Sequence, residues 1–205
     1  MITILDYGIG NLLSVKNMLA KAGVATAVIS GSEENLQQAD KIILPGVGHF
    51  DAGMRKLKAS GLFELLNQRV LEDNIPVLGI CLGAQMLTKG SEEGDEEGLG
   101  WIDAYCEKFD TAKMEKPLSV PNMGWAEVLE KKDSVLIKEL PAEPRFYFTH
   151  SYHILCGNPS DQLLSADYGY EFTAAVEKDN IFGTQFHPEK SHKFGMKLLS
   201  NFARA

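Results

Sequence analysis

The sequence predicts an α/β fold, with a mainly parallel central sheet flanked by helices and additional antiparallel strands in the second half. In the first half, short apolar runs alternate with stretches whose apolar residues recur at helical spacing, which is typical of parallel sheets. In the second half, strand-like runs follow one another and a helical pattern appears only at the end. The 205 residues suffice for one sizeable core and contain no obvious linker, so we expect a single domain over residues 1–205.

Four strands and three helices are expected in the first half. The strands are the short apolar runs Ile2–Asp6, Val24–Ile29, Lys41–Leu44 and Pro76–Ile80. The helices are expected over residues 12–22, which end at Gly23, over residues 51–72, with Asp51 as the N-cap, and over residues 82–90.

Six further strands and one helix are expected in the second half. The strands are Trp101–Phe109, Ala126–Glu130, Arg145–Thr149, Leu163–Asp167, Thr173–Glu177 and Ile181–Phe186. The helix covers residues 191–202, where Phe194, Leu198 and Phe202 share one stripe.

Charge and cysteine usage exclude several classes of protein. The net charge is −8 and the basic residues form no long run, so we expect neither a nucleic-acid partner nor a membrane-surface partner. The N-terminus lacks a basic signal-peptide pattern, and no apolar run is long enough to span a bilayer. Three widely spaced cysteines favour neither disulfides nor a zinc site. We therefore expect a cytoplasmic protein with no cofactor and no metal.

The segment Gly79-Ile80-Cys81-Leu82-Gly83 is the strongest functional signal. It follows an apolar strand pattern and precedes a helical one, which is the arrangement of a nucleophile elbow. The sharp turn crowds the backbone, so the flanking residues must be small. It also sets the sulfur at the positive end of a helix, where a thiolate is favoured. Cys81 is therefore the candidate nucleophile.

A base and a residue that orients it are found near the C-terminus. His187 follows an apolar strand pattern, and Glu189 comes two residues later. Residues two apart on an extended chain point the same way, so Glu189 can reach the imidazole of His187. If the sheet is parallel, Cys81 and His187 both lie past the carboxyl ends of strands, where such sheets place their sites. The sequence thus predicts a Cys-His-Glu triad.

Acyl transfer also needs donors for a developing oxyanion. Pro45-Gly46-Val47-Gly48 follows a predicted strand, and its glycines allow backbone N–H groups to turn toward a ligand. The elbow supplies a further N–H, that of Leu82. We expect Val47, Gly48 and Leu82 to form the oxyanion hole.

These segments resemble the class I (triad) glutamine amidotransferases. The elbow followed by Gln85, the Pro-Gly-Val-Gly loop and Phe186-His187-Pro188-Glu189 carry this resemblance. Further segments resemble, more narrowly, the glutaminase subunits of imidazole glycerol phosphate synthase, and the likeness spans essentially the whole chain. These segments are residues 6–11, 121–125, 148–152 and 187–191.

The resemblance implies hydrolysis of L-glutamine to L-glutamate and ammonia through Cys81, His187 and Glu189. It implies that Gly46, Gln85, Glu93, Ser151 and Tyr152 bind the substrate, with Glu93 on its α-ammonium group. It also implies that ammonia passes to a synthase (cyclase) subunit of (β/α)₈ fold in a heterodimer, with Asn11, Met123, Trp125, Tyr147 and Lys190 at the interface.

Several alternatives stay open at this stage. Ala84, His153 and the segment Ser191–Met196 resemble a paralogous branch that supplies ammonia for a bacterial surface-polysaccharide sugar, so the acceptor is either this sugar or the histidine-pathway precursor. A stand-alone cysteine γ-glutamyl hydrolase or peptidase is another possibility. A nucleotide-binding module is suggested only by Gly8-Ile9-Gly10, whose third fingerprint position is Leu13 rather than glycine.

Overall fold

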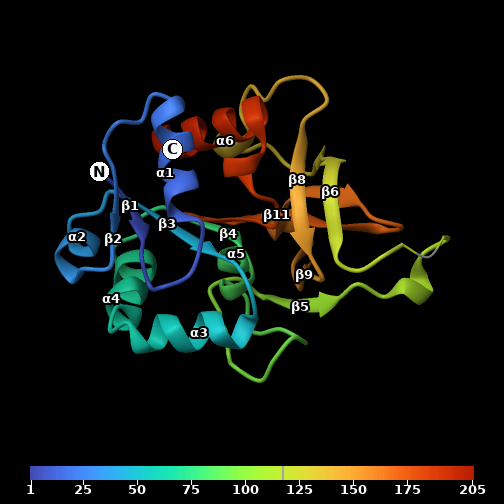
Figure 1. Cartoon of the computed structure of the whole chain (residues 1–205), viewed down its shortest axis with the longest axis horizontal. Helices are drawn as coiled ribbons and strands as arrows, with labels where there is room; N and C mark the ends of the chain where they lie inside the picture. Colours follow the sequence, from blue (N-terminus) through green and yellow to red (C-terminus); the bar gives the residue numbers. More distant parts are fainter. Residues whose placement is uncertain (117) are drawn as a thin grey trace.

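The protein, seen in a computed structural model that describes residues 1–116 and 118–205, has the predicted α/β architecture (Figure 1). Ten of its described strands form one mixed sheet. They are β1 (Ile2–Leu5), β2 (Ala27–Ser30), β3 (Lys41–Gly46), β4 (Val77–Cys81), β5 (Ala104–Lys108), β7 (Leu129–Glu130), β9 (Tyr152–Cys156), β10 (Gln162–Asp167), β11 (Glu171–Lys178) and β12 (Ile181–Thr184). Two more strands, β6 (Asn122–Glu127) and β8 (Arg145–His150), form a separate ribbon.

The large sheet is parallel at one side and antiparallel at the other. Its main path runs in the order β2-β1-β3-β4-β12-β11-β10-β7, and β9 pairs with both β11 and β5. Strands β2, β1, β3, β4 and β12 are mutually parallel, whereas β11, β10, β7, β9 and β5 pair antiparallel. The parallel strands come from the part of the sequence where strands and helices alternate, plus the last strand, as the sequence pattern predicts.

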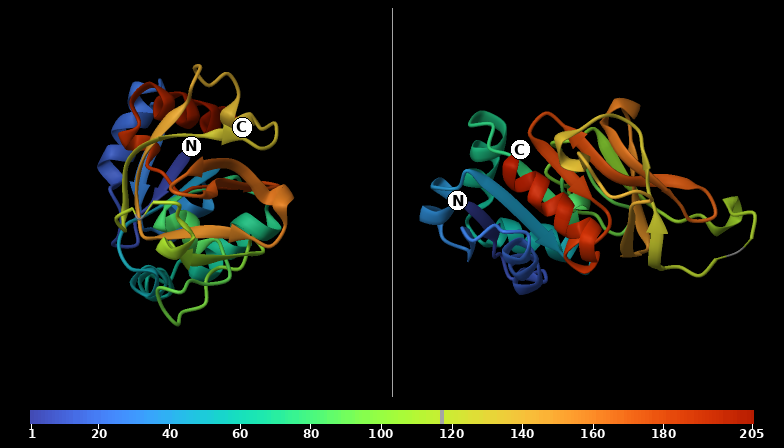
Figure 2. Two further views of the ribbon diagram at one scale, coloured as in Figure 1. Left: turned by 90° about the vertical axis from the view of Figure 1, so that its right-hand side faces the viewer. Right: turned by 90° about the horizontal axis from the view of Figure 1, so that it is seen from above.

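Helices cover both faces of the parallel part (Figure 2). On one face lie α1 (Leu12–Lys21) and the C-terminal α6 (His192–Arg204), whose Leu19 and Phe202 join a core cluster with Leu78. On the other lie α2 (Glu33–Gln37), α3 (Phe50–Ala59), α4 (Phe63–Asn67) and α5 (Leu82–Met86), which bury Leu57 and Leu66. Short turns complete the fold: η1 (Gln68–Glu72), η2 (Thr111–Lys113), η3 (Val135–Ile137), η4 (Pro159–Asp161) and η5 (Pro188–Lys190).

The strand order places three chain segments side by side. Strand β4 lies between β3 and β12, and all three are parallel, so their carboxyl ends meet at one edge of the sheet. The register pairs Gly46 with Cys81 and Ile80 with Thr184. The Pro-Gly-Val-Gly loop, the elbow and the segment leading to His187 therefore converge.

The prediction of one long helix over residues 51–72 is wrong in detail. The segment is divided into α3, α4 and the π-helical turn η1, with a break at Gly61, whose φ is +78°. Asp51 is not the N-cap, because His49 occupies that position and accepts the Asp51 N–H. The Asp51 carboxylate instead accepts the N–H groups of Asp95 and Glu96 and so holds the acidic loop formed by residues 92–97.

Other boundaries also differ from expectation. The helix after the elbow ends at Met86 rather than near residue 90, and the strand expected over residues 126–130 is divided between β6 and β7. Strand β9 and helix α2 are additional elements that periodicity did not indicate. Both contain only five residues, and a pattern of that length is weak in a single sequence.

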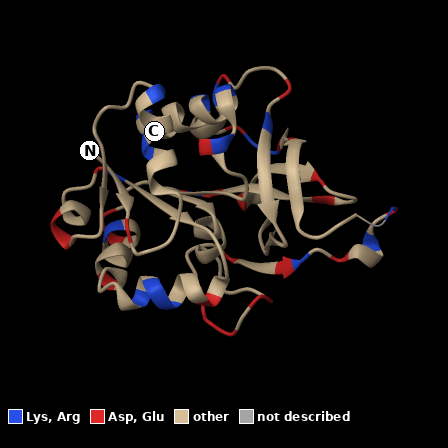
Figure 3. Ribbon diagram, in the orientation of Figure 1, with Lys and Arg blue, Asp and Glu red and all other residues tan. Residues whose placement is uncertain are grey.

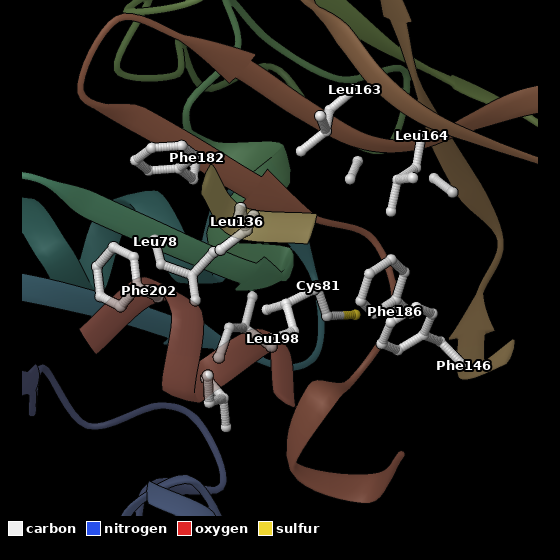
Figure 4. Close-up of a cluster of buried hydrophobic side chains, with 14 of the residues drawn as sticks. Leu78, Cys81, Leu136, Phe146, Leu163, Leu164, Phe182, Phe186, Leu198 and Phe202 are labelled. Atoms are coloured by element: carbon white, nitrogen blue, oxygen red, sulfur yellow. The ribbon is translucent and has the colours of Figure 1, made fainter. Parts of the chain in front are cut away.

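The β6–β8 ribbon has two chemically different faces. Phe146 and Phe148 lie on the inner face and are fully buried. Figure 4 shows Phe146 stacked on Phe186 beside Cys81, with ring centroids 3.9 Å apart. Met123 and Trp125 lie on the outer face, where 64% and 44% of their surfaces are exposed. The ribbon therefore connects the core around Cys81 to an exposed apolar surface.

Acidic and basic residues are interspersed along the elements of the fold (Figure 3). The acidic loop after α5 is partly neutralised, because Glu96 pairs with Lys58 at 2.7 Å and with Arg55 at 3.8 Å. Across residues 1–116 and 118–205, we find no helix with the length and apolarity needed to cross a membrane.

Glycines allow the elbow to pack against β3. A Cβ on Gly83 would lie 1.8 Å from the Leu44 carbonyl oxygen, and one on Gly46 would lie 2.6 Å from the Gly83 nitrogen. A Cβ on Gly79 would lie 2.7 Å from the Gly83 carbonyl oxygen. Because backbone atoms cannot move aside as a flexible side chain can, these positions exclude larger residues. This confirms that the residues flanking Cys81 must be small.

We predict that Gly83→Ala separates α5 from β3 and destabilises the protein by about 2–3 kcal/mol, because the added methyl group overlaps backbone. The matched control is Gly23→Ala, where nothing lies within 4 Å of the added Cβ and only the positive φ of +84° is strained, which costs about 1 kcal/mol. Urea unfolding of both variants measures the difference. Equal stability losses would contradict the packing role of Gly83.

Candidate active site

A cavity of about 460 Å³ opens at the carboxyl ends of β3, β4 and β12. Residues from the Pro-Gly-Val-Gly loop, the elbow, the end of β8 and the segment after β12 line it. It contains both charged and apolar side chains, which suits a small zwitterionic ligand. The lining residues are Val47, Gly48, Cys81, Leu82, Gln85, Glu93, Pro121, Thr149, His150, Ser151, Tyr152, His187 and Lys190.

Cys81 has a strained backbone. It joins β4 directly to α5 with φ +54° and ψ −111°, in a region that L-residues rarely adopt. Such a conformation costs roughly 1–3 kcal/mol and persists only where packing enforces it, here through the glycine contacts with β3. The side chain is 7% exposed, and its sulfur lies 3.9 Å from the Thr149 carbonyl oxygen. The structure thus has the geometry of a nucleophile elbow.

His187 and Glu189 form a buried pair beside Cys81. His187 Nδ1 lies 2.8 Å from Glu189 Oε1, and the two residues are 1% and 8% exposed. A carboxylate can only accept, so Nδ1 carries the hydrogen and Nε2 is left for chemistry in the cavity. Glu189 reaches the ring across the 3₁₀ turn η5 rather than along an extended chain as expected.

The environment of His187 favours its protonated form. Burial alone lowers its pKa, but the nearby Cys81 and the hydrogen bond to Glu189 outweigh burial and raise the pKa to about 9. Strand β8 fixes the backbone, because the His187 N–H donates to the Tyr147 carbonyl at 2.9 Å. The Ser191 hydroxyl donates to the His187 carbonyl at 2.6 Å. The imidazole is therefore held in place, and its raised pKa favours the form that is protonated on both nitrogens.

The Pro-Gly-Val-Gly loop is anchored at its start. The buried Tyr7 hydroxyl donates to the Pro45 carbonyl at 2.7 Å, and Gly46 packs against the elbow. Gly46 is not among the residues that line the cavity, so its contact with substrate stays a prediction. Val47 and Gly48 do line it, and Gly48 has a φ of +100° with open space around its Cβ position. The freedom of this loop is concentrated at Gly48.

The expected substrate-binding residues Gln85, Glu93, Ser151 and Tyr152 all line the cavity. One oxygen of Glu93 accepts the N–H of Phe50 at the start of α3, at 2.7 Å, which fixes the carboxylate. The Ser151 carbonyl accepts the Phe109 N–H, and the Tyr152 carbonyl accepts from Gln85 and His150. A ligand carboxylate is itself an acceptor, so it could bond the N–H groups of these two residues or the Ser151 hydroxyl, but not their carbonyls.

A neutral histidine connects the ribbon to the cavity. His150 Nδ1 lies 2.8 Å from the Tyr152 carbonyl, so it must donate, and Nε2 then accepts from Asn122 at 3.2 Å. Burial is the main cause that lowers the pKa of His150, to about 3. This fixed tautomer holds the Tyr152 carbonyl where Gln85 also binds it.

Four of the five residues expected at a partner interface lie together near the cavity. Met123 and Trp125 share the outer face of the ribbon, and the Trp125 ring centroid is 6.2 Å from that of Tyr147. Lys190 Nζ lies 5.7 Å from the Tyr147 ring and also lines the cavity. Asn11 is exposed just before α1, which packs against η5.

Some residues of the site were missed by the sequence analysis. Thr149 and Pro121 line the cavity, and the Gln185 side-chain nitrogen lies 3.9 Å from the Cys81 sulfur. Gln185 gave a usable signal, because it is a polar residue within the apolar run Ile181–Phe186 and a buried polar group needs a partner. Thr149 contacts Cys81 through its backbone carbonyl, so the type of its side chain gives no signal in the sequence.

Together these groups can perform acyl transfer at an amide or ester carbonyl. A buried thiol, an imidazole oriented by a carboxylate, and backbone N–H groups around one cavity are what such a reaction requires. Among the residues described, we find no group of three or more His, Cys, Asp or Glu side chains placed to hold a metal ion.

Comparison with known sequences gives matches along the whole chain. The sequence model of the family "Glutamine amidotransferase class-I" matches residues 3–205. "Imidazole glycerol phosphate synthase subunit HisH 2" of Pseudomonas aeruginosa is 52% identical over 202 residues, which cover 98% of each chain. A protein of the same name from Methanococcus maripaludis is 50% identical over 204 residues, which cover 100% of this chain and 99% of that protein.

Solved structures share the fold. A glutamine amidotransferase from Thermotoga maritima superposes with a TM-score of 0.64 at 19% identity and covers 92% of this chain and 75% of that one. The glutaminase domain of CTPS from Trypanosoma brucei, with bound acivicin, gives a TM-score of 0.64 at 16% identity, covering 99% and 93%. These likenesses support the fold described above.

We predict that iodoacetamide near neutral pH modifies Cys81 and leaves Cys106 and Cys156 intact. Burial raises the pKa of the Cys106 thiol to about 12 and that of Cys156 to about 11, so neither forms an appreciable amount of the reactive thiolate. Mass spectrometry of proteolytic peptides locates the adduct, and Cys81→Ala is the control. Modification of Cys106 or Cys156 with Cys81 left intact would contradict the assignment.

Proposed function

We propose that this chain, which belongs to the class I glutamine amidotransferase family, is the glutaminase subunit of imidazole glycerol phosphate synthase and serves histidine biosynthesis. It hydrolyses L-glutamine and supplies the ammonia to a synthase subunit. The observation that carries the proposal is the strained Cys81 at the end of β4, with the His187–Glu189 pair at the end of the neighbouring strand β12. The relatives named HisH, about half identical over nearly their whole length, support the same assignment.

In the proposed mechanism, the Cys81 thiolate attacks the side-chain amide carbon of glutamine. The carbonyl π electrons move to oxygen, and the N–H groups of Leu82 and of Val47 or Gly48 stabilise this oxyanion. His187 donates its proton to the amide nitrogen as the C–N bond breaks, which releases ammonia and leaves a γ-glutamyl thioester. A pKa of about 9 keeps this proton on His187 until the leaving group needs it.

Water then completes the cycle. Neutral His187 removes a proton from water, the resulting hydroxide attacks the thioester, and the C–S bond breaks to give glutamate and the Cys81 thiolate. Glu189 orients the imidazole and stabilises its charged form throughout. Glu93 attracts the α-ammonium group of the substrate in this proposal, and the N–H groups of Ser151 and Tyr152 bind its α-carboxylate, which is supported by the position of all three residues in the cavity lining.

The outer face of the β6–β8 ribbon supports a role in binding the synthase subunit. Met123, Trp125 and Tyr147 form an apolar surface with Lys190 at its edge, next to the cavity. His187 donates to the backbone of Tyr147, so contact at this face reaches the catalytic histidine through one hydrogen bond. We propose that a (β/α)₈ synthase subunit docks here and receives the ammonia.

The identity of the molecule that finally accepts the ammonia is the most specific part of the proposal. His192, one of the residues that resemble the paralogous surface-sugar branch, stacks on Trp125 with ring centroids 5.4 Å apart. It therefore lies on the proposed docking face. Incubation of the chain with its co-purified synthase, glutamine and either a ribosyl-imidazole precursor or a sugar nucleotide tests the acceptor. Formation of imidazole glycerol phosphate supports the histidine pathway, and an aminated sugar alone contradicts it.

For the triad, we predict that Cys81→Ser and His187→Asn each lower kcat for glutamate release by at least about 10³-fold, because the residues act as a unit. Glu189→Gln should cost less, since Glu189 orients the imidazole without carrying the transferred proton. Cys156→Ser is a matched control and should keep the wild-type kcat. Near-wild-type activity of His187→Asn would overturn the mechanism.

For the partner, we predict that the isolated chain is a poor glutaminase and that the synthase subunit with its acceptor raises the rate at least about 10²-fold. A factor of this size corresponds to one additional N–H donor in the oxyanion hole. We expect the partner to select the orientation of the loop that supplies this donor, because Gly48 allows the loop to adopt more than one orientation.

Variants at the proposed interface provide the second half of that test. Trp125→Ala and Lys190→Ala should weaken activation more than the basal rate, whereas Lys41→Ala, at the amino end of β3 and away from the cavity, should change neither. Full turnover by the free chain, with no effect of the partner, would favour a stand-alone hydrolase.

A further inference from the structure

Gln185 is a fully buried residue in the segment between β12 and His187. Its side chain lies between two residues of the site. Oε1 accepts from Gln85 Nε2 at 3.1 Å, and Nε2 lies 3.9 Å from the Cys81 sulfur. Its backbone is fixed as well, because the Gln185 N–H donates to the Ala174 carbonyl at 2.9 Å. The Gln185 side chain is therefore fixed both by its backbone and by its amide oxygen, next to Cys81.

The direction of this amide follows from its neighbours. The Tyr152 carbonyl can only accept, so Gln85 must present its NH₂ group to it, at 3.0 Å. That same NH₂ group also faces Gln185, which must then present its oxygen. The NH₂ group of Gln185 consequently points at the Cys81 sulfur. One backbone carbonyl thus sets the orientation of two glutamine side chains in series.

We propose that Gln185 is a further catalytic residue, whose side-chain N–H contacts the Cys81 sulfur and stabilises the attacking thiolate. This rests on the proposed function, in which Cys81 is the nucleophile. The neutral thiol has a different partner. Its S–H group donates to the Thr149 carbonyl oxygen, which lies 3.9 Å from the sulfur. An N–H donor, by contrast, interacts more strongly with a sulfur that bears a negative charge. Gln185 therefore favours the reactive state of Cys81.

Other titratable groups face the same cavity and also act on the sulfur. They are Glu93 from the loop after α5, His150 and Tyr152 from β8 and β9, and His187 and Lys190 after β12. A substitution at Gln185 leaves all of them in place. Gln85 also keeps its bond to the Tyr152 carbonyl when Gln185 is replaced. A change in the pH dependence of Cys81 reactivity then reports on the lost N–H donor.

The test is the rate of Cys81 alkylation by iodoacetamide across pH, in the full chain without glutamine. Gln185→Met keeps the approximate shape and removes the donor. We expect the midpoint of its rate–pH profile to rise by about one unit, which lowers the rate at neutral pH about tenfold, with a similar limiting rate at high pH. Gln185→Glu places a negative charge beside the sulfur and should raise the midpoint further.

Gln162→Met is a matched control on β10, where the Gln162 side chain bonds Thr173 instead, and it should keep the wild-type profile. A purely structural role for Gln185 would change stability or the limiting rate without moving the midpoint. If Gln185→Met does not fold, Gln185→Leu decides, because it also removes the N–H donor and adds no charge beside the sulfur.

An unchanged midpoint in a folded Gln185 variant would overturn the inference while wild-type glutaminase activity stands. Failure of the wild type to release glutamate even with the synthase subunit and its acceptor would instead reject the proposed function itself. The alkylation profile does not depend on glutaminase activity.

Discussion

The structure depends on one close approach of backbone to backbone. Helix α5 begins at the elbow and packs directly on β3, at a separation that leaves no room for a Cβ on Gly83 or Gly46. This contact enforces the positive φ of Cys81. The strained conformation costs roughly 1–3 kcal/mol, so without the contact the backbone would relax. As a consequence, three groups lie next to one another: the sulfur, the first N–H groups of α5 and the Pro-Gly-Val-Gly loop. A nucleophile on an ordinary helix or strand would not meet all three.

Strand order does the rest of the assembly. Because β4 lies between β3 and β12, the nucleophile receives the loop from one neighbour and the His187–Glu189 pair from the other. The ribbon strand β8 adds the fourth side, through the Thr149 carbonyl near the sulfur and the Tyr147 carbonyl that fixes His187. The same strand carries the half-buried Tyr147 side chain, so the proposed docking face and the catalytic centre are two faces of one element.

The fold class and the convergence of Cys81 with His187 could be predicted from sequence, because alternating strand and helix patterns imply a parallel sheet and its carboxyl edge. The interruption of the helix over residues 51–72 had a signal that we missed, because a glycine after a turn with lysines, as at Gly61, is typical of a helix C-terminus. Asp51 resembles an N-cap, but its carboxylate bonds a loop more than forty residues away. Gln185 stands out in the sequence as a polar residue within an apolar run, but its contact with Cys81, like that of the Thr149 carbonyl, could not be predicted, because these partners are distant in sequence.

The most direct test of the account is the crystal structure of the chain after reaction with a glutamine analogue that carries an electrophilic carbonyl in place of the amide. We predict a covalent bond to Cys81, with its φ still positive. The former carbonyl oxygen should lie about 3 Å from the N–H groups of Leu82 and of Val47 or Gly48. An adduct on another residue, or an adduct on Cys81 whose oxygen faces solvent while the elbow has relaxed to a negative φ, would contradict the account.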